Sequence, residues 1–191
     1  MIDPSRAWID ESGSDRTLDP QTYILAAAIT RTSIEDDLRG RMAALRLRGQ
    51  LKVHWRDEAS WRQTTLCKEV AALDLESIVV VRPGRTNRQA KPERQRRETL
   101  DRLLWELESL GVSDVVLESR GRADDQRDVE LANALRGQRR LSTNMRLTHR
   151  LGRNEPLLWI PDVICGAVSH SRTGAGQYLD LLDPKVRLIE I

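Results

Sequence analysis

Trp8-Ile9-Asp10-Glu11-Ser12-Gly13 joins an apolar pair to two carboxylates, a serine and a glycine. This order predicts a strand that brings Asp10 to its C-terminal end, where Gly13 turns the chain sharply. Because side chains alternate along a strand, Asp10 shares one face with Trp8, and Glu11 shares the other with Ile9. Only one of the two acids can therefore point to a given side of the sheet.

The acid at the end of this strand has two interpretations. A carboxylate at a strand end suits a metal ion, because the sheet and not a mobile loop holds its backbone. The alternative is an ordinary acid leaving a strand into a turn, where Asp, Ser and Gly are common. The stretch by itself leaves both open.

Length and composition indicate one globular unit. The chain has 191 residues and a net charge of +2, and we expect a single domain, 1–191, with a proper core. Strand-like and helix-like segments alternate, which predicts an α/β fold. The small charge does not demand a polyanionic partner. The basic residues are mostly arginine, which suits bidentate phosphate contacts, although a GC-rich genome gives the same excess.

Targeting signals are not visible in the sequence. The N-terminus lacks a basic region followed by an apolar run, and no apolar stretch approaches the roughly 20 residues of a membrane span. We therefore expect a cytoplasmic protein with no membrane association. Cys67 and Cys165 have no spacing suited to zinc and are interpreted as buried free thiols.

Three further segments carry specific expectations. The β-branched run Ser77–Val81 is typical of a central parallel strand. Leu51–Trp55 alternates like a short strand or an extended arm. A helix is expected over Ser60–Leu73, with Trp61 among its inward-facing residues.

Three carboxylates occupy comparable places: Asp10 and Glu118 at strand ends, and Asp162 in the first turn of a late helix. If the strands are neighbours and the helix crosses their ends, the acids converge. Hard cations prefer clustered oxygen ligands, and two ions about 3.5–4 Å apart can act on a phosphodiester. Each acid also has a simpler role, because Asp162 suits the helix dipole and Glu118 can pair with Arg120.

Four segments appear in an order that resembles a known family: Trp8–Gly13, the apolar strand Tyr23–Ile29, the acid-ended strand Val115–Arg120, and Leu158–Ala167. The order is similar to that of the ribonuclease H-like family known as domain of unknown function 3800. Members begin with an Asp-Glu-Ser-Gly strand and end with a helix motif of the form Leu-Gln-x-Ala-Asp-x-x-x-Gly. The resemblance spans nearly the whole chain and implies a ribonuclease H-like mixed sheet flanked by helices.

The resemblance also implies a site. Asp10, Glu118 and Asp162 take the places of metal-binding catalytic carboxylates, with Mg²⁺ or Mn²⁺ as the cofactor. Glu11 is a further catalytic candidate and Asp128 an outer one. Two departures affect the coordination: Leu158–Pro161 lacks the family's glutamine and alanine, and Glu118 is longer than the usual aspartate.

The expected function follows from these assignments. The family implies a metal-dependent nuclease that acts on DNA or RNA, with a possible protein partner in a mobile-element or phage-defence system. The competing hypothesis is a non-catalytic ribonuclease H-like binding module within a larger assembly.

Basic residues are the expected nucleic-acid contacts, since phosphate contacts supply a salt-dependent part of affinity. A simpler interpretation is that they belong to a solvated loop and helix start. The candidates are Arg85, Arg88, Arg94 and Arg97, with a weaker assignment of Lys52 and His54.

Overall fold

The centre of the protein is a six-stranded sheet with the order β5-β4-β1-β2-β3-β6. The computed structural model describes residues 3–84 and 91–191. The strands are β1 (Ser5–Gly13), β2 (Tyr23–Arg31), β3 (Glu76–Arg82), β4 (Asp114–Glu118), β5 (Arg146–Arg150) and β6 (Val186–Glu190). The helices are α1 (Glu35–Ala44), α2 (Ser60–Ala71), α3 (Pro92–Ser109), α4 (Arg122–Gly137), α5 (Trp159–Arg172) and α6 (Gln177–Asp180).

Strand directions make the sheet mixed, as predicted. β1 is antiparallel to β2 and parallel to β4, and β4 is parallel to β5. β3 is antiparallel to β2 and parallel to β6. The expectation of a parallel strand over Ser77–Val81 is therefore only half right. A β-branched run indicates burial on both faces, which β3 has, and does not determine strand direction.

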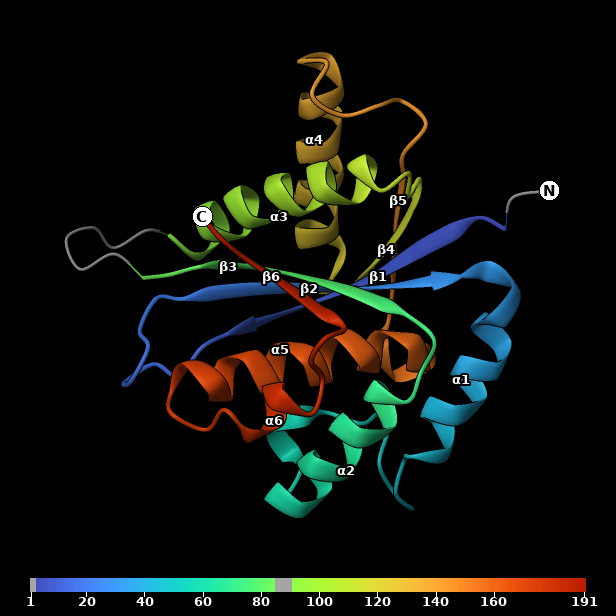
Figure 1. Cartoon of the computed structure of the whole chain (residues 1–191). Coiled ribbons are helices and arrows are strands. Elements are labelled where there is room, and N and C mark those ends of the chain that lie inside the picture. Colours follow the sequence, from blue (N-terminus) through green and yellow to red (C-terminus); the bar gives the residue numbers. More distant parts are fainter. Residues whose placement is uncertain (1–2, 85–90) are drawn as a thin grey trace.

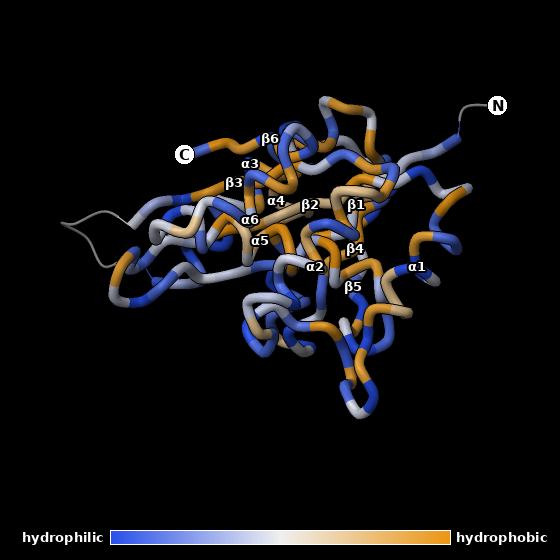
Figure 2. The backbone as a smooth tube through the Cα atoms, turned by 60° about the horizontal axis from the view of Figure 1, so that its bottom comes forward, coloured by the Kyte–Doolittle hydropathy of each residue, from blue (hydrophilic) through white to orange (hydrophobic). Residues whose placement is uncertain are grey.

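Helices cover both faces of the sheet. Figure 1 shows α3 and α4 on one face, and α5, α6, α2 and α1 on the other. In Figure 2 the central strands have mostly tan to orange, hydrophobic colours, whereas blue, hydrophilic stretches are frequent in the outer segments. The sheet thus separates two apolar cores, one in each layer.

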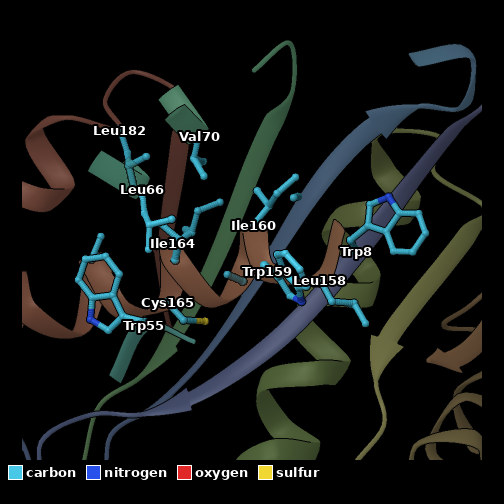
Figure 3. Packing of buried hydrophobic residues seen from close by; sticks show 14 of the residues in the cluster. Trp8, Trp55, Leu66, Val70, Leu158, Trp159, Ile160, Ile164, Cys165 and Leu182 are labelled. Atoms are coloured by element: carbon cyan, nitrogen blue, oxygen red, sulfur yellow. The ribbon is translucent and has the colours of Figure 1, made fainter. Parts of the chain in front are cut away.

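β1 contributes to both cores by alternation. Trp8 belongs to the core under α5, together with Trp159, and Ile9 belongs to the core under α3. Figure 3 shows the first of these cores, with Trp8, Trp159 and Ile160 between α5 and the sheet. The predicted division of faces along β1 is confirmed, so Asp10 and Glu11 leave the strand on opposite sides.

Leu51–Trp55 forms no strand, and the alternative of an extended arm fits better, because His54 has an extended backbone before the 3₁₀ turn at Trp55–Asp57. The inward orientation expected for Trp61 is wrong. Trp61 points outward and is 69% exposed, because α2 buries Leu66 and Val70 on its other side. Cys67 and Cys165 are buried and free, as expected. Within the described ranges, no helix is both long and apolar enough to span a membrane.

Candidate metal and nucleic-acid site

Asp10 lies near the C-terminal end of β1, on the face that α5 covers. Its side chain shares that face with Trp8, two residues earlier. The backbone N–H of Glu11 donates to Asp10 Oδ1 at 2.8 Å, which orients the carboxylate. β1 is a central strand, in which Asp10 pairs with Ala26 of β2 and the preceding residue, Ile9, pairs with Leu117 of β4.

Glu118 is the last residue of β4, the parallel neighbour of β1. It is two residues beyond Val116, which belongs to the core under α5, so Glu118 lies on the same face as Asp10. Gly152 packs directly against the Glu118 carboxylate, where any Cβ would overlap it. The longer acid is thereby confined between its strand and the connection that leads from β5 to α5.

Asp162 lies in the first turn of α5 and is buried. Its Oδ2 accepts a hydrogen bond from the backbone N–H of Trp55 at 2.7 Å, and its Oδ1 lies 3.3 Å from His54 Nδ1. The contact with Asp162 raises the pKa of His54. The segment before α2 therefore reaches across the molecule and orients the acid of α5.

Gly166 permits this approach. A Cβ at position 166 would overlap the indole ring of Trp55. On its other edges the indole meets the rings of His170 and Tyr178, with centroids 5.3 and 5.2 Å away. Gly166 follows Asp162 by one helical turn, so a single face of α5 both accepts the Trp55 N–H and seats the Trp55 ring.

The three acids act on one another electrostatically. The pKa of Asp10 is raised well above its usual range, first by burial, then by the charges of Asp162 and Glu118. The carboxyl group of Glu118 is also within hydrogen-bonding reach of Asp10. Carboxylates so close together need a proton or a cation between them.

Lys52 supplies one such cation. Its Nζ donates to Glu118 Oε1 at 2.7 Å. Burial acts to lower the pKa of Lys52, but the hydrogen bond to Glu118 and the charges of Glu118, Asp10 and Asp162 outweigh it and raise the pKa. The single ammonium of Lys52 offsets only part of the negative charge of the three carboxylates.

The chemistry of this donor set fits a hard divalent cation. Mg²⁺ and Mn²⁺ prefer carboxylate oxygens, and the acids lie on one side of the sheet, where their charge is only partly balanced. As the side chains stand, however, no three His, Cys, Asp or Glu residues in ranges 3–84 and 91–191 are close enough to hold one ion.

Glu11, predicted as a catalytic residue, lies on the opposite face of the sheet. Its carboxylate accepts from the hydroxyl of Tyr23 at 2.6 Å and forms an ion pair with Arg96. The alternation of side chains along β1 separates it from Asp10. The structure thus gives Glu11 a structural ion pair and argues against a place among the three acids.

Asp128, the outer candidate, belongs to the same opposite network. Arg96 donates to both of its carboxylate oxygens, at 2.8 and 2.6 Å, and His149 Nε2 lies 3.1 Å away. Burial acts to raise the pKa of Asp128, but the bonds from Arg96 and His149 outweigh it and lower the pKa to about 2. Asp128 is a buried partner of Arg96 and does not reach the Asp10 side.

The predicted basic contacts are dispersed. Arg94 pairs with Glu98 at 2.7 Å, and Arg97 lines a small hollow between α3 and α4. Both belong to α3, which covers the face opposite the three acids. Arg85 and Arg88 lie outside the described residues. Lys52 and His54 do adjoin the site, but they contact Glu118 and Asp162.

Arg56 is a neighbour of the site that the sequence did not single out. Its Nη2 donates to Gly13 O at 2.8 Å and to Ser12 Oγ at 3.3 Å, at the end of β1. The only signal was its position directly after the segment that contains His54. Gly152 was also missed, because a close approach between distant segments leaves no local pattern. Gly166 is the glycine of the helix motif, but the motif gave no sign of its contact with Trp55.

Comparison with known proteins supports the fold. A chain in the solved structure of the PCNA:RNase HII complex from Archaeoglobus fulgidus is similar, with a TM-score of 0.52. The similarity covers 93% of this chain and 78% of that chain, at 16% sequence identity. At such low identity the similarity concerns the fold alone.

No protein-family model matches the chain, and no curated protein is similar to it. Membership of the domain of unknown function 3800 family therefore stays a prediction. The six-stranded mixed sheet, its helices on both faces and the RNase HII neighbour together establish the fold: the chain has a ribonuclease H-like α/β fold.

Proposed function

We propose that this protein is a divalent-metal-dependent nuclease whose site is formed by Asp10, Glu118 and Asp162. The observation that supports the proposal is the convergence of these acids, from two adjacent strands and one helix, on a single side of the sheet. A cluster of carboxylates that lacks balancing cations is costly, so it indicates a functional role more than a structural one.

Each acid in this proposal has a distinct support. The sheet fixes Asp10, the N–H of Trp55 fixes Asp162, and Glu118 is confined by Gly152. Bound Mg²⁺ or Mn²⁺ would polarise the scissile phosphate and lower the pKa of a water molecule. Lys52 balances the charge of the Glu118 carboxylate until the ion binds, and His54 keeps Asp162 oriented.

The substrate in this proposal is DNA or RNA, and phosphodiester hydrolysis is the reaction. A partner in a mobile-element or phage-defence system remains an expectation from the family resemblance. The nuclease role itself rests on the arrangement of the acids within a ribonuclease H-like fold.

A second candidate is a ribonuclease H-like binding module without catalysis. The ion pair between Lys52 and Glu118 favours it, because an ammonium occupies one acid of the cluster. Within the described residues the acids also lack the spacing for a shared ion. Such a module would keep the fold and bind its partner without metal.

A nuclease assay separates the two. Labelled single- and double-stranded DNA, RNA and hybrid substrates are incubated with Mg²⁺, Mn²⁺ or EDTA, and thermal melts are recorded under the same conditions. Metal-dependent cleavage together with a metal-induced rise in Tm supports the nuclease. No cleavage and no rise in Tm would reject it in favour of the binding module.

A further inference from the structure

Two hollows beside the acids meet at Gly13 and Arg56. The first has a volume of about 200 Å³ and is lined by Asp162, His54 and the end of β1. The second, of about 670 Å³, begins at the same Gly13 and Arg56 and follows the β1–β2 loop, residues 14–22. The two hollows share Gly13 and Arg56 and run from Asp162 along the β1–β2 loop, and we call them together the Arg56 groove.

Arg56 provides positive charge where the two hollows join. Among residues 3–84 and 91–191, its guanidinium contacts two neutral acceptors at the end of β1, the Ser12 hydroxyl and the Gly13 carbonyl. Because it is exposed, the guanidinium can also receive an anion from the groove. Arg16, also exposed, lines the second hollow.

Acids also line the two hollows. Asp15, in the second, accepts from the backbone N–H groups of Thr17 and Leu18, each at 2.7 Å, and Glu11, in the first, pairs with Arg96. Asp19 pairs with Arg172 at 2.6 Å. Hydroxyl-bearing residues also line the second hollow: Ser14, Thr17, Ser169 and Thr173, of which Ser169 donates to Ser14 and Thr173 to backbone carbonyls of α5. Arginine and hydroxyl donors of this kind are the groups that proteins use on phosphate oxygens.

The wall of the groove is preformed. Gln95 of α3 donates to the backbone carbonyl of Gln21, and the N–H of Gly84 donates to Thr22 Oγ1 at 3.0 Å. Gly84 also packs on the backbone of Pro20 so closely that a Cβ would overlap it. A loop held at several points loses little conformational entropy when a ligand binds.

The position of Arg56 is linked to the acids through one residue. Trp55 immediately precedes it, and the N–H of Trp55 donates to Asp162. An anion on Arg56 therefore lies at a fixed place relative to a group held at Asp162. Successive phosphates of one strand meet this requirement, since they lie at a regular spacing along the backbone.

We propose that the Arg56 groove binds the sugar–phosphate backbone of one nucleic-acid strand. Arg56 contacts the phosphate next to the one at Asp10 and Asp162, and Arg16 contacts a phosphate further along. This inference rests on the proposed function for the position of the reacting phosphate, and it adds the path of the strand.

The test measures binding separately from cleavage. Fluorescence anisotropy follows labelled single-stranded DNA and RNA, duplex and hybrid in EDTA, across a salt series, with Asp10→Asn as the parent. Arg56→Ala and Arg16→Ala are added to it. Arg41→Ala, an exposed arginine of α1, is the matched control. Thermal melts verify that each variant folds.

We expect Arg56→Ala to weaken binding about five- to tenfold and to reduce the slope of log affinity against log salt by about 1, as loss of one phosphate contact does. Arg16→Ala should have a smaller effect of the same kind, and Arg41→Ala should match the parent. Arg56→Ala with the parent's affinity and slope would overturn the inference, as would a parent that binds none of the four probes at low salt.

Failure of the groove and failure of the nuclease proposal give different results. If the wild type cleaves but binding ignores Arg56, the strand path is wrong and the nuclease remains. If binding depends on Arg56 but no metal supports cleavage, the groove serves a binding module. The two conclusions are thus separable in one set of proteins.

Discussion

Asp10 and Glu11 are neighbours in sequence, yet they belong to opposite electrostatic environments. On the α5 face, Asp10 meets two further acids and one lysine, and its pKa is raised. On the α3 face, Glu11 meets Arg96, which also holds Asp128. The second network is balanced by its own arginines and the first is not. Stability explains the balanced network, whereas the unbalanced one needs a proton or a cation to offset its charge.

The largest expected effect is on the balanced side. Asp128→Asn leaves buried Arg96 without its bidentate partner, and breaking a buried ion pair typically costs about 3–5 kcal/mol of unfolding free energy. Urea unfolding of the variant measures this loss. Addition of Mg²⁺ should not restore it, and a metal-dependent recovery would contradict the division between the two faces.

The next effect is on the unbalanced side. Asp10→Asn keeps the shape of the side chain but removes a charge, and we expect hydrolysis to fall by roughly a hundred- to a thousandfold, the range for loss of one electrostatic group in a site. Without metal, the Tm should hold or rise, because fewer like charges repel. The measurement is cleavage at saturating Mn²⁺, paired with melts in EDTA.

Glu11→Gln is the matched control for that experiment, since it removes a charge one residue away. Glu11→Gln should lower the free energy of unfolding, because it weakens the ion pair with Arg96. It should leave the metal-induced change in Tm intact. Equal loss of activity in Asp10→Asn and Glu11→Gln would show that both acids serve one site.

Acid titration gives a smaller effect. The folded pKa of Asp128 is about 2, against 3.8 for the ordinary carboxyl group. Its contribution is therefore present above pH 4 and is lost as the pH falls toward 2. The difference between these two pKa values corresponds to about 2 kcal/mol of unfolding free energy, at about 1.36 kcal/mol for each pKa unit. Urea unfolding between pH 2 and 5 should show a flatter pH dependence in Asp128→Asn than in the wild type.

The smallest effect concerns Lys52. Lys52→Met removes the ammonium from Glu118, and because the pair is partly exposed we expect a loss of about 1 kcal/mol in EDTA. Addition of Mg²⁺ should raise the Tm of Lys52→Met more than that of the wild type, since the ion then neutralises the acids in place of the ammonium. Melts with and without Mg²⁺ measure this, and an equal metal response in both proteins would exclude competition between lysine and ion.

The sequence predicted the elements of the site better than their surroundings. Alternation along β1 placed Asp10 and Glu11 on opposite faces, because the strand period of two is a local property. Asp162 was expected in the first turn of a helix after Pro161, although the helix begins slightly earlier, at Trp159. The ion pair between Lys52 and Glu118 joins residues 66 positions apart and could not be predicted.

Burial was predicted less well than secondary structure. Trp61 was expected inside because a large apolar side chain on a helix usually faces a core, yet α2 exposes it. Which side of a helix is buried depends on what lies opposite, and periodicity alone does not specify that partner. The burial of Asp128 likewise depends on a partner from another helix, Arg96 of α3, which periodicity does not reveal.

The contact between Gly166 and Trp55 has a consequence for sequence variation among related chains. Glycine inside a helix costs about 1 kcal/mol relative to alanine, so its presence in α5 reflects the indole that rests on it. A chain that keeps a large aromatic residue at position 55 must keep glycine at 166, and one with a small residue at 55 is free to change it. Covariation of these two positions, with aspartate held four residues before the glycine, would distinguish chains that assemble this site from chains that share only the sheet.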